Sequence, residues 1–483
     1  MILAELFPYA GLAYKILLYG YMVAVVAVII IIISENRNPV KSLAWVTVLL
    51  LLPWVGLLLY ILFGRNLKGY RLISRRGKKK LHPSRRKTEE NTNDKPDRLW
   101  TSDARMVHMV GNIADSKLLE GNKIEIFTSG AEKFETLKRD LLAAKRYIHL
   151  QYYIYENDRI GREIREILIQ KASEGVTVRV MYDHFGSFTI NAAFFQRMRR
   201  SGVEAHAFLK LTLTKLANRL NWRNHRKIVV IDGKIGYIGG MNIADRYVYG
   251  DHGKPAWRDT HLRIIGPAVA DMEYCFAVDW SFTKRDLLID EAEQATEACS
   301  DGDPVQIVPG GPTGLWNSMS FVFLRAIAGA RRCVFLQTPY FLPSDALLKA
   351  LQSAALSGVD VRIMLPRKND SPLLRLASGS YIKECLLAGI KIFFYEPAML
   401  HSKVVIVDDD FATTGSTNFD FRSFEHNFEC NAVVHSRAFN RRMKEIFYED
   451  QRHCTRIILS HWRRRPVAVK ALESIFRLMA PIL

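Results

Sequence analysis

The chain repeats one pattern of polar residues, and this internal repeat constrains its fold more than any other feature. Residues 224–242 read NHRKIVVIDGKIGYIGGMN, and residues 400–418 read LHSKVVIVDDDFATTGSTN. In each copy a His is followed by a Lys after two residues, an Asp after seven and an Asn after 17. The copies lie 176 residues apart. Two matches of this length indicate a duplicated structural unit.

The segments around the motifs repeat as well. The phrases GVTVRVM and GVDVRIM lie 183 residues apart, and the strand-like stretches RYIHLQYYIY and CVFLQTPYF share Leu-Gln at an offset of 186. Between them, REIREILIQKASEG and SDALLKALQSAALSG have apolar residues at helical spacing and end at a glycine. Strand–helix–strand units predict an α/β fold with mainly parallel sheets flanked by helices, formed twice.

The repeated residues suit a polar site. Residues i and i+2 of a strand share one face, so each copy would present an imidazole beside an ammonium group. Each Asp has the opposite parity and falls at the strand end, where Asp232-Gly233 suggests a hairpin turn, so we expect a structural role for it. Small residues before each Asn allow close approach of a ligand. The candidate catalytic residues are His225, Lys227, Asp232, His401, Lys403 and Asp408, and the candidate substrate-binding residues are Asn242 and Asn418.

Displacement at a phosphodiester is the chemistry that fits these groups. Two lysines and two asparagines can hold phosphate oxygens, one His can attack phosphorus, and the other can protonate the leaving alkoxide. An ordinary imidazole pKa of about 6.5 allows one neutral and one protonated His near neutrality. Because the sequence has no carboxylate cluster, we expect neither a metal nor another cofactor.

Two uncharged apolar runs precede the repeats. Residues 16–33 contain no charge in 18 positions, and residues 43–63 contain none in 21. About 20 apolar residues cross a bilayer, so the pair predicts a transmembrane hairpin, with Pro53 inside the second span. The alternatives are a signal-peptide core, against which the absence of a basic n-region and a cleavage site argues, and a buried helix of a soluble domain.

Positive charge is concentrated after the second run. The chain carries a formal charge of +19, and residues 65–87 hold eleven Lys or Arg and no acid. By the positive-inside rule this side is cytoplasmic. The segment would hold an anionic leaflet or serve as a solvated linker. The six cysteines form no CxxC pair, which is typical of reduced thiols.

The repeated His, Lys and Asp residues resemble the HKD motifs of the phospholipase D superfamily, in which two copies of the motif form one site across a pseudo-two-fold interface. With the apolar hairpin, and with WRDTH, TPYFLPSD and GSTNFDFRSFEHNFE, the chain is similar over nearly its whole length to bacterial cardiolipin synthases. The resemblance implies that His225 is the nucleophile and His401 the general acid/base, although the sequence permits the reverse. It also implies that Asp259 and Glu429 each orient a His. Gly240 stands where many members have Ser.

The implied reaction joins two phosphatidylglycerol molecules into cardiolipin and glycerol, at a bacterial cell membrane with cytoplasmic catalytic domains. Phosphatidylglycerol and anionic membrane lipid are the expected partners; nucleic acid is not. The expected organisation is a hairpin over residues 1–64, a basic linker over 65–100, and phospholipase D-like domains over 101–298 and 299–483. The alternatives are a hydrolase acting on lipid or nucleic acid, with the apolar hairpin arguing against the nuclease, a synthase that uses another acceptor lipid, and an inactive lipid-binding scaffold. Residues 467–483 are predicted to form either an interfacial amphipathic helix or a helix packed on the core.

Overall fold

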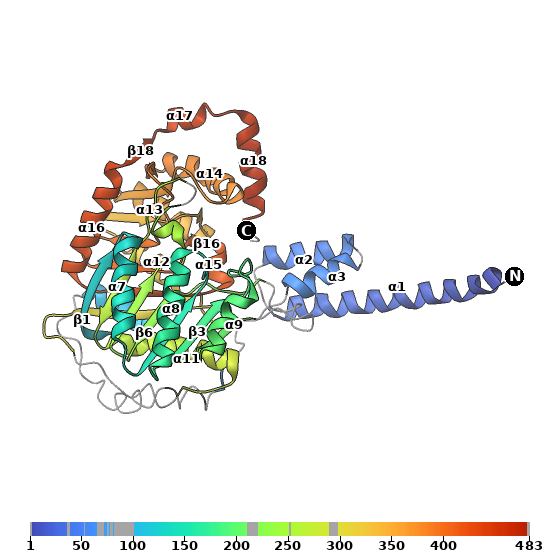
Figure 1. Cartoon of the computed structure of the whole chain (residues 1–483). Coiled ribbons are helices and arrows are strands. Elements are labelled where there is room, and N and C mark those ends of the chain that lie inside the picture. Colours follow the sequence, from blue (N-terminus) through green and yellow to red (C-terminus); the bar gives the residue numbers. More distant parts are fainter. Residues whose placement is uncertain are drawn as a thin grey trace. The chain divides into compact units, whose positions relative to one another are not determined.

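A computed structural model describes residues 2–35, 39–52, 54–64, 72–74, 77, 81, 101–209, 221–250, 253–288 and 298–480. The chain divides into two compact units. One comprises Met1–Leu67 with Leu211–Asn221, and the other comprises Lys68–Lys210 with Trp222–Leu483. Figure 1 shows the elements of each unit, which are described separately below.

Among its described residues, the N-terminal unit contains one helix that is long and apolar enough to cross a membrane. Within α1 (Ile2–Ser34), residues Tyr14–Ser34 have a mean hydropathy of 3.0. The second apolar run is divided into α2 (Pro39–Leu51), α3 (Val55–Leu59) and a π-helical turn η1 (Tyr60–Gly64). At about 1.5 Å per residue, the 13 residues of α2 extend for about 20 Å, less than the thickness of the hydrocarbon core. The second span therefore stays a prediction.

The two apolar runs contact each other inside this unit. The Tyr21 hydroxyl on α1 donates a hydrogen bond of 2.5 Å to the Leu49 carbonyl on α2, and Trp45 lies edge-on to Tyr60. Most of the other described α1 side chains are exposed. The predicted basic linker, residues 65–100, lies outside the described residues apart from positions 72–74, 77 and 81.

The second unit is built on one mixed sheet, with 16 strands among the described residues. Its order is β18-β13-β12-β10-β14-β15-β17-β9-β1-β8-β7-β6-β2-β3-β4, and β5 pairs with β17. The first half contains β1 (Leu119–Phe127), β2 (Tyr147–Tyr152), β3 (Thr177–Asp183), β4 (Glu204–Phe208), β5 (Arg223–Asn224), β6 (Ile228–Ile231), β7 (Ile235–Gly239) and β8 (His261–Ile265). The second contains β9 (Asp303–Gly310), β10 (Cys333–Gln337), β12 (Asp360–Pro366), β13 (Lys391–Tyr395), β14 (Val404–Val407), β15 (Phe411–Gly415), β17 (Asn427–Val434) and β18 (Cys454–Ile457).

Strand order repeats in the two halves. From the centre outward, the first half runs β1, β8, β7, β6, β2, β3, β4, and the second runs β9, β17, β15, β14, β10, β12, β13. The expectation of two mainly parallel sheets is wrong in two respects. The halves join into one sheet through the antiparallel β1–β9 pair, and parallel pairing among the described strands of this sheet is limited to β2–β3–β4, β10–β12–β13 and the short β5 beside β17. The motif hairpins β6–β7 and β14–β15 make the inner strands antiparallel.

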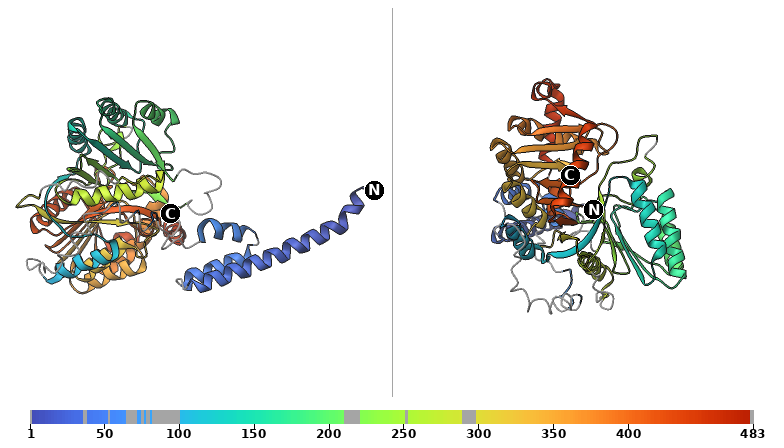
Figure 2. Two further views of the ribbon diagram at one scale, coloured as in Figure 1. Left: turned by 90° about the horizontal axis from the view of Figure 1, so that it is seen from below. Right: turned by 90° about the vertical axis from the view of Figure 1, so that its left-hand side faces the viewer.

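Helices cover both faces of the sheet, as Figure 2 shows from two directions. Alternate residues of β6 pack in opposite directions: Val229 joins the core formed with α7, α8 and α9, whereas Val230 joins the core beneath α11. The helices of the first half are α7 (Gly130–Ala143), α8 (Arg159–Ser173), α9 (Ala192–Arg200) and α11 (Ala268–Lys284). Their counterparts are α12 (Ser318–Ala328), α13 (Asp345–Leu356), α14 (Pro372–Leu387) and α16 (Arg437–Arg452).

Candidate active site

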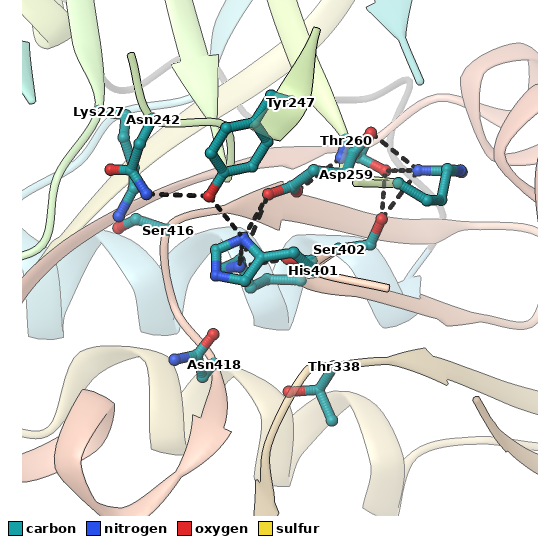
Figure 3. A network of polar contacts seen from close by, with 12 residues as sticks. Lys227, Asn242, Tyr247, Asp259, Thr260, Thr338, His401, Ser402, Ser416 and Asn418 are labelled. Atoms are coloured by element: carbon teal, nitrogen blue, oxygen red, sulfur yellow. Dashed lines mark hydrogen bonds and ion pairs between the residues drawn. The ribbon is translucent and has the colours of Figure 1, made fainter. Parts of the chain in front are cut away.

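Both motif histidines line one cavity of about 320 Å³. His225 comes from the first half of the sheet and His401 from the second, and Asn242 and Asn418 line the same cavity. The two histidines are only 7% and 5% exposed. Figure 3 shows the part of this site around His401. The structure thus brings together four residues that the sequence repeat singled out.

The motif segments enter the site as extended chain just before a strand. His225 and Lys227 lie between β5 and β6, and His401 and Lys403 precede β14. This corrects the expectation that each pair sits within a strand. The backbone N–H of His225 donates to the carbonyl of Phe428 at 2.9 Å, and that of His401 donates to Arg258 at 2.7 Å. At each motif His, the backbone is therefore hydrogen-bonded to the opposite half of the sheet and not to the hairpin of its own half.

Each imidazole contacts a carboxylate from the opposite half. His225 Nδ1 lies 3.0 Å from both Glu429 oxygens, and His401 Nδ1 lies 2.6 Å from Asp259 Oδ2. Both carboxylates are fully buried. Glu429 lies on β17, which runs parallel to β5, and Asp259 follows the Arg258–Leu400 bridge. The same pairing that positions each motif backbone therefore places its carboxylate.

The surroundings of His225 favour a neutral imidazole. Burial lowers the pKa of His225 to about 4, although Glu429 opposes this shift. Burial raises the pKa of Glu429, but its contacts with His225, Lys227 and Ser416 outweigh burial and hold the pKa below its usual range. Because an anionic Glu429 accepts a hydrogen bond, the imidazole proton belongs on Nδ1. The Nε2 lone pair is then available for nucleophilic attack.

His401 has a different environment, shown in Figure 3. Its Nδ1 is approached by Lys403 Nζ at 2.7 Å and by the Tyr247 hydroxyl at 3.3 Å, besides Asp259. Burial lowers the pKa of His401 well below its ordinary value, and Lys403 and Lys227 add to that shift. Burial raises the pKa of Asp259 to about 6. A proton can therefore be held between Asp259 and His401 at a higher pH than between Glu429 and His225.

The two motif lysines are buried directly behind the histidines. Lys227 Nζ donates to the His225 carbonyl at 2.6 Å, and Lys403 Nζ donates to the His401 carbonyl. Lys227 and Lys403 are 1% and 2% exposed. Burial lowers the pKa of Lys403 to about 8 and that of Lys227 well below its usual value. A bound phosphate anion would stabilise their charged forms.

The two asparagines differ in their protein contacts. Asn242 Oδ1 accepts from the Ile154 N–H at 3.2 Å, and its Nδ2 donates to the Tyr247 hydroxyl at 3.0 Å. Asn418 Oδ1 is buried without a hydrogen-bond partner among the residues that the structure describes. This oxygen can only accept a hydrogen bond, so the second half retains an unused acceptor where the Asn242 oxygen is already satisfied.

Asp232 and Asp408 do not line the cavity. The Asp232 carboxylate accepts from the N–H groups of residues 145, 146 and 147 at 2.8–2.9 Å. The Asp408 carboxylate accepts from the N–H groups of residues 331, 332 and 333 at 2.7–2.9 Å. Both aspartates have positive φ, 53° and 48°, at the hairpin turn. They tie the turn to the start of a neighbouring strand, which is the structural role that their parity indicates.

The two halves differ at the position two residues before each motif asparagine, which is Gly240 in the first half and Ser416 in the second. Ser416 donates a hydrogen bond of 2.5 Å to Glu429 Oε2. At the matching position, a Cβ on Gly240 would lie 2.2 Å from Asp259 Oδ1. Asp259 thus occupies the space that a serine side chain would need, and its Oδ1 accepts instead from the Thr260 N–H at 2.7 Å.

Sequence reasoning missed three arginines that line the cavity, and two of them occupy matching positions in the two halves. Arg246 and Arg422 each follow a motif asparagine by four residues, so they share the 176-residue offset. Arg246 contacts Glu156 at 3.2 Å and lies over the Trp257 ring. Extending the comparison of the two copies by four residues would have found both. The other cavity residues beyond the predicted set are Tyr153, Ile154, Arg223, Tyr247, Trp257, Tyr340, Asp370, Leu374, Asp420 and Asn427.

A repeated half-sheet in which a motif His and a motif Asn from each half line one cavity, with a buried Lys beside each His, defines an enzyme of the phospholipase D class. A family described as "Cardiolipin synthase, PLD-like domain" matches residues 137–253 and 323–451, and one described as "Phospholipase_D-nuclease N-terminal" matches residues 22–65. The chain belongs to the family of cardiolipin synthases with phospholipase D-like domains.

Relatives of known name match this chain along most of its length. The cardiolipin synthase of Geobacillus thermodenitrificans is 38% identical, covering 95% of this chain and 92% of its own. The major cardiolipin synthase ClsA of Bacillus subtilis is 36% identical, covering 96% and 98%. Phosphatidylserine synthase from Haemophilus influenzae, a solved structure, superposes with a TM-score of 0.62 at 17% identity over 80% of this chain and 100% of its own, which indicates a shared fold.

Proposed function

We propose that this protein is a cardiolipin synthase that transfers a phosphatidyl group from one phosphatidylglycerol molecule to another and releases glycerol. The observation that carries the proposal is the reciprocal arrangement at the cavity, where the imidazole of each half contacts a buried carboxylate of the other half. The pKa of Glu429 lies below its usual range, whereas burial raises the pKa of Asp259 to about 6, and this difference between the two carboxylates suits the two roles that such a transfer needs.

In the first step, the Nε2 lone pair of His225 attacks phosphorus. The bond between phosphorus and the oxygen of the headgroup glycerol breaks, His401 gives its proton to that oxygen, and glycerol leaves. The product is a phosphatidyl-histidine. In the second step, the hydroxyl of another phosphatidylglycerol gives its proton to His401 and attacks phosphorus. The phosphorus–nitrogen bond breaks, and cardiolipin leaves with His225 regenerated.

The positive groups around the cavity would hold the phosphate. Lys227 and Lys403 lie behind the two imidazoles and would compensate the charge of the transition state. The Asn242 amide would donate to a non-bridging oxygen after exchanging its contact with Tyr247, and the Asn418 amide would do so after exchanging its contact with Asp420. Arg246 and Arg422 would bind the anionic lipid at the cavity wall.

The membrane arrangement belongs to the same proposal. The segment Tyr14–Ser34 would be the first span, and α2 with α3 would complete a second. The basic residues after the hairpin would keep the catalytic domains, residues 101–298 and 299–483, on the cytoplasmic side of a bacterial inner membrane. Phosphatidylglycerol in that membrane would then reach the site from the leaflet beside it.

The test is to incubate the purified protein in liposomes with labelled phosphatidylglycerol and to separate the products. Cardiolipin with one equivalent of glycerol is the expected result. Phosphatidic acid as the sole product would mean that water is the acceptor, and a phosphatidyl ester of another alcohol would identify a different acceptor lipid. No turnover of any phosphodiester would leave only a lipid-binding scaffold.

His225→Ala and His401→Ala should each abolish turnover while the protein stays in the membrane fraction. If His225 is the nucleophile, His401→Ala should still form labelled phosphatidyl-protein from a lipid with a good leaving group, because such a group needs no acid. His225→Ala should form none. Labelling of the His225 variant alone would reverse the two roles.

A further inference from the structure

Helix α18 (Val467–Leu478) has two faces with different surroundings. Its inner face packs along α14: Arg477 pairs with Glu384 at 2.6 Å, and the buried Glu473 pairs with Arg465. A Cβ on Gly379 of α14 would lie 2.5 Å from Glu473 Oε1, so the two helices are in close contact. Figure 1 shows α18 beside α14. The inner face is therefore part of the folded core.

The outer face is an apolar stripe with no cover among the residues that the structure describes. At about 100° per residue, seven consecutive positions around the helix fall on an arc of about 140°. Every one is apolar and exposed, including Val467 at 79%, Ile475 at 55% and Leu478 at 82%. The stripe consists of Val467, Ala468, Ala471, Leu472, Ile475, Leu478 and Met479. A helix that only needed to pack on α14 would be polar on this side.

The segment that carries the stripe is strongly basic. Residues 454–480 contain six Lys or Arg and one acid. The acid is Glu473, which is buried and paired with Arg465, and Arg477 pairs with Glu384. The four remaining basic residues have no acidic partner within this segment. Arg456, Arg463 and Arg464 are exposed around α17 (Leu459–Arg463). An apolar stripe beside unopposed positive charge is the pattern of a helix that lies on an anionic bilayer.

The start of α18 lies close to the active-site cavity. Val469 and Arg465 share a cavity of about 300 Å³ with Arg375 and Leu376 of α14. Leu374, one residue earlier on α14, lines the active-site cavity, as does Asp370 in the preceding loop. A bilayer in contact with α18 would therefore lie near the start of α14, which lines the active-site cavity through Leu374.

We propose that α18 docks on the surface of an anionic lipid bilayer, with its apolar stripe among the acyl chains and its basic neighbours against the headgroups. This inference rests on the proposed function only in taking the substrates from that bilayer. A second copy of the chain is a poorer occupant, because a two-fold contact would place the same basic surface opposite itself. Each Lys or Arg near an anionic surface contributes about 1 kcal/mol, so charge favours the bilayer.

The first test measures immersion directly in the full chain. A fluorophore is attached at Ile475→Cys, in a background where the exposed Cys299 and half-exposed Cys454 are serine, and the protein is reconstituted into vesicles of phosphatidylglycerol and phosphatidylcholine. Gln170→Cys, at an exposed position of α8, is the matched control. We expect a lipid-borne quencher to reduce the fluorescence at position 475 several-fold more than at position 170, and less so at high salt.

Equal quenching at positions 475 and 170 would overturn the proposal. Quenching between labelled copies that rises with protein density at position 475, without quenching by lipid, would overturn it in favour of a second copy. Both readouts are independent of turnover, so they remain decisive if the proposed reaction is wrong.

The second test uses Ile475→Glu with Leu478→Glu. In vesicles we expect turnover of phosphatidylglycerol to fall about tenfold, because two apolar side chains no longer enter the interface. In detergent micelles, where substrate reaches the site from a small aggregate, turnover should change less than about twofold. Loss in both media would mean a damaged fold, and unchanged turnover in vesicles would mean that the stripe does not dock.

Discussion

At the scale of single residues, the duplicated site is not symmetrical. Glu429 receives a hydrogen bond from Ser416 and contacts His225 through both oxygens, whereas the Asp259 side chain is one methylene group shorter and faces Gly240. The consequence is electrostatic. The pKa of Glu429 stays below its usual range, and burial raises that of Asp259 to about 6. In the proposed mechanism, the first pair would supply the nucleophile and the second the proton donor.

Gly240→Ser should inactivate the enzyme, even though it inserts the residue found in the other half. Its Cβ would lie 2.2 Å from Asp259 Oδ1, so the carboxylate must leave His401. We expect kcat on phosphatidylglycerol to fall at least about 100-fold through loss of this orientation. Gly310→Ala is the control, because its Cβ would meet only Glu429 at an ordinary 3.7 Å. Normal turnover of Gly240→Ser would show that Asp259 does not position His401.

The low pKa of His225 predicts an unusual acid limb in the pH profile. Protonation removes the lone pair, so kcat/KM falls as pH falls through the pKa. With a pKa of about 4, about nine-tenths of His225 is still neutral at pH 5, whereas an ordinary imidazole would be almost fully charged. We expect no loss of kcat/KM between pH 7 and pH 5. A half-maximal rate near pH 6.5 in protein that remains folded would contradict this assignment.

At the scale of elements, the local repeat was predictable and the sheet was not. The repeated sequence segments predict β2, β3, β10 and β12 to within a few residues of their observed bounds, and α13 forms over the stretch SDALLKALQSAALSG, where helical spacing predicts it. The inner strands are antiparallel because each Asp turn folds the chain back at once, a feature visible in IDGK that we did not extend to the sheet. Periodicity indicates which residues form a strand, but it does not identify the neighbouring strands.

Asp408→Asn should destabilise the β14–β15 hairpin without touching the cavity. Asparagine tolerates the positive φ, but its amide nitrogen would face the Arg331 N–H that the carboxylate now accepts. We expect a loss of about 1–3 kcal/mol in thermal or denaturant unfolding followed in detergent. Asp410→Asn, which removes only a pairing with the exposed Arg437, should cost less than about 1 kcal/mol. Equal effects of the two substitutions would argue against the turn-anchoring role.

Contact between α14 and α18 depends on the missing side chain of Gly379. In Gly379→Ala the new methyl group would displace Glu473, which pairs with Arg465. We expect faster amide hydrogen exchange across α18, by about tenfold or more, with little change in β10 or β14. Ser380→Ala, at the next position on the helix, is the control and should leave exchange in α18 unchanged. Unchanged exchange in both variants would show that α18 does not rely on this contact.

At the scale of the whole catalytic unit, the site exists only where the halves meet. The His225–Glu429 and His401–Asp259 contacts join residues 204 and 142 positions apart. No local pattern specifies such pairs, and only the family resemblance indicated that these acids orient a His. The motif residues themselves were identifiable because the same spacing occurs twice. Arg246 and Arg422 had the same signal, but it lay beyond the stretch that we compared.

Residues 1–298 and 299–483, produced as separate chains, should each be inactive, because neither contains both members of a His–carboxylate pair. Produced together, they should associate through β1 and β9 and recover measurable turnover of phosphatidylglycerol. Co-purification of the second fragment with the membrane-bound first fragment is the measurement of association. Turnover by either fragment alone would contradict a site shared across the sheet.

The exchange of carboxylates between the halves also limits how the gene can change. After the duplication, a loss of function in one copy could not be masked by the other, because each copy supplies what the other lacks. The two copies could therefore differ in detail, as they do at Gly240 and Ser416, but both had to remain in one protein for the site to form. A gene that kept one copy alone would recover the chemistry only if its product assembled with itself.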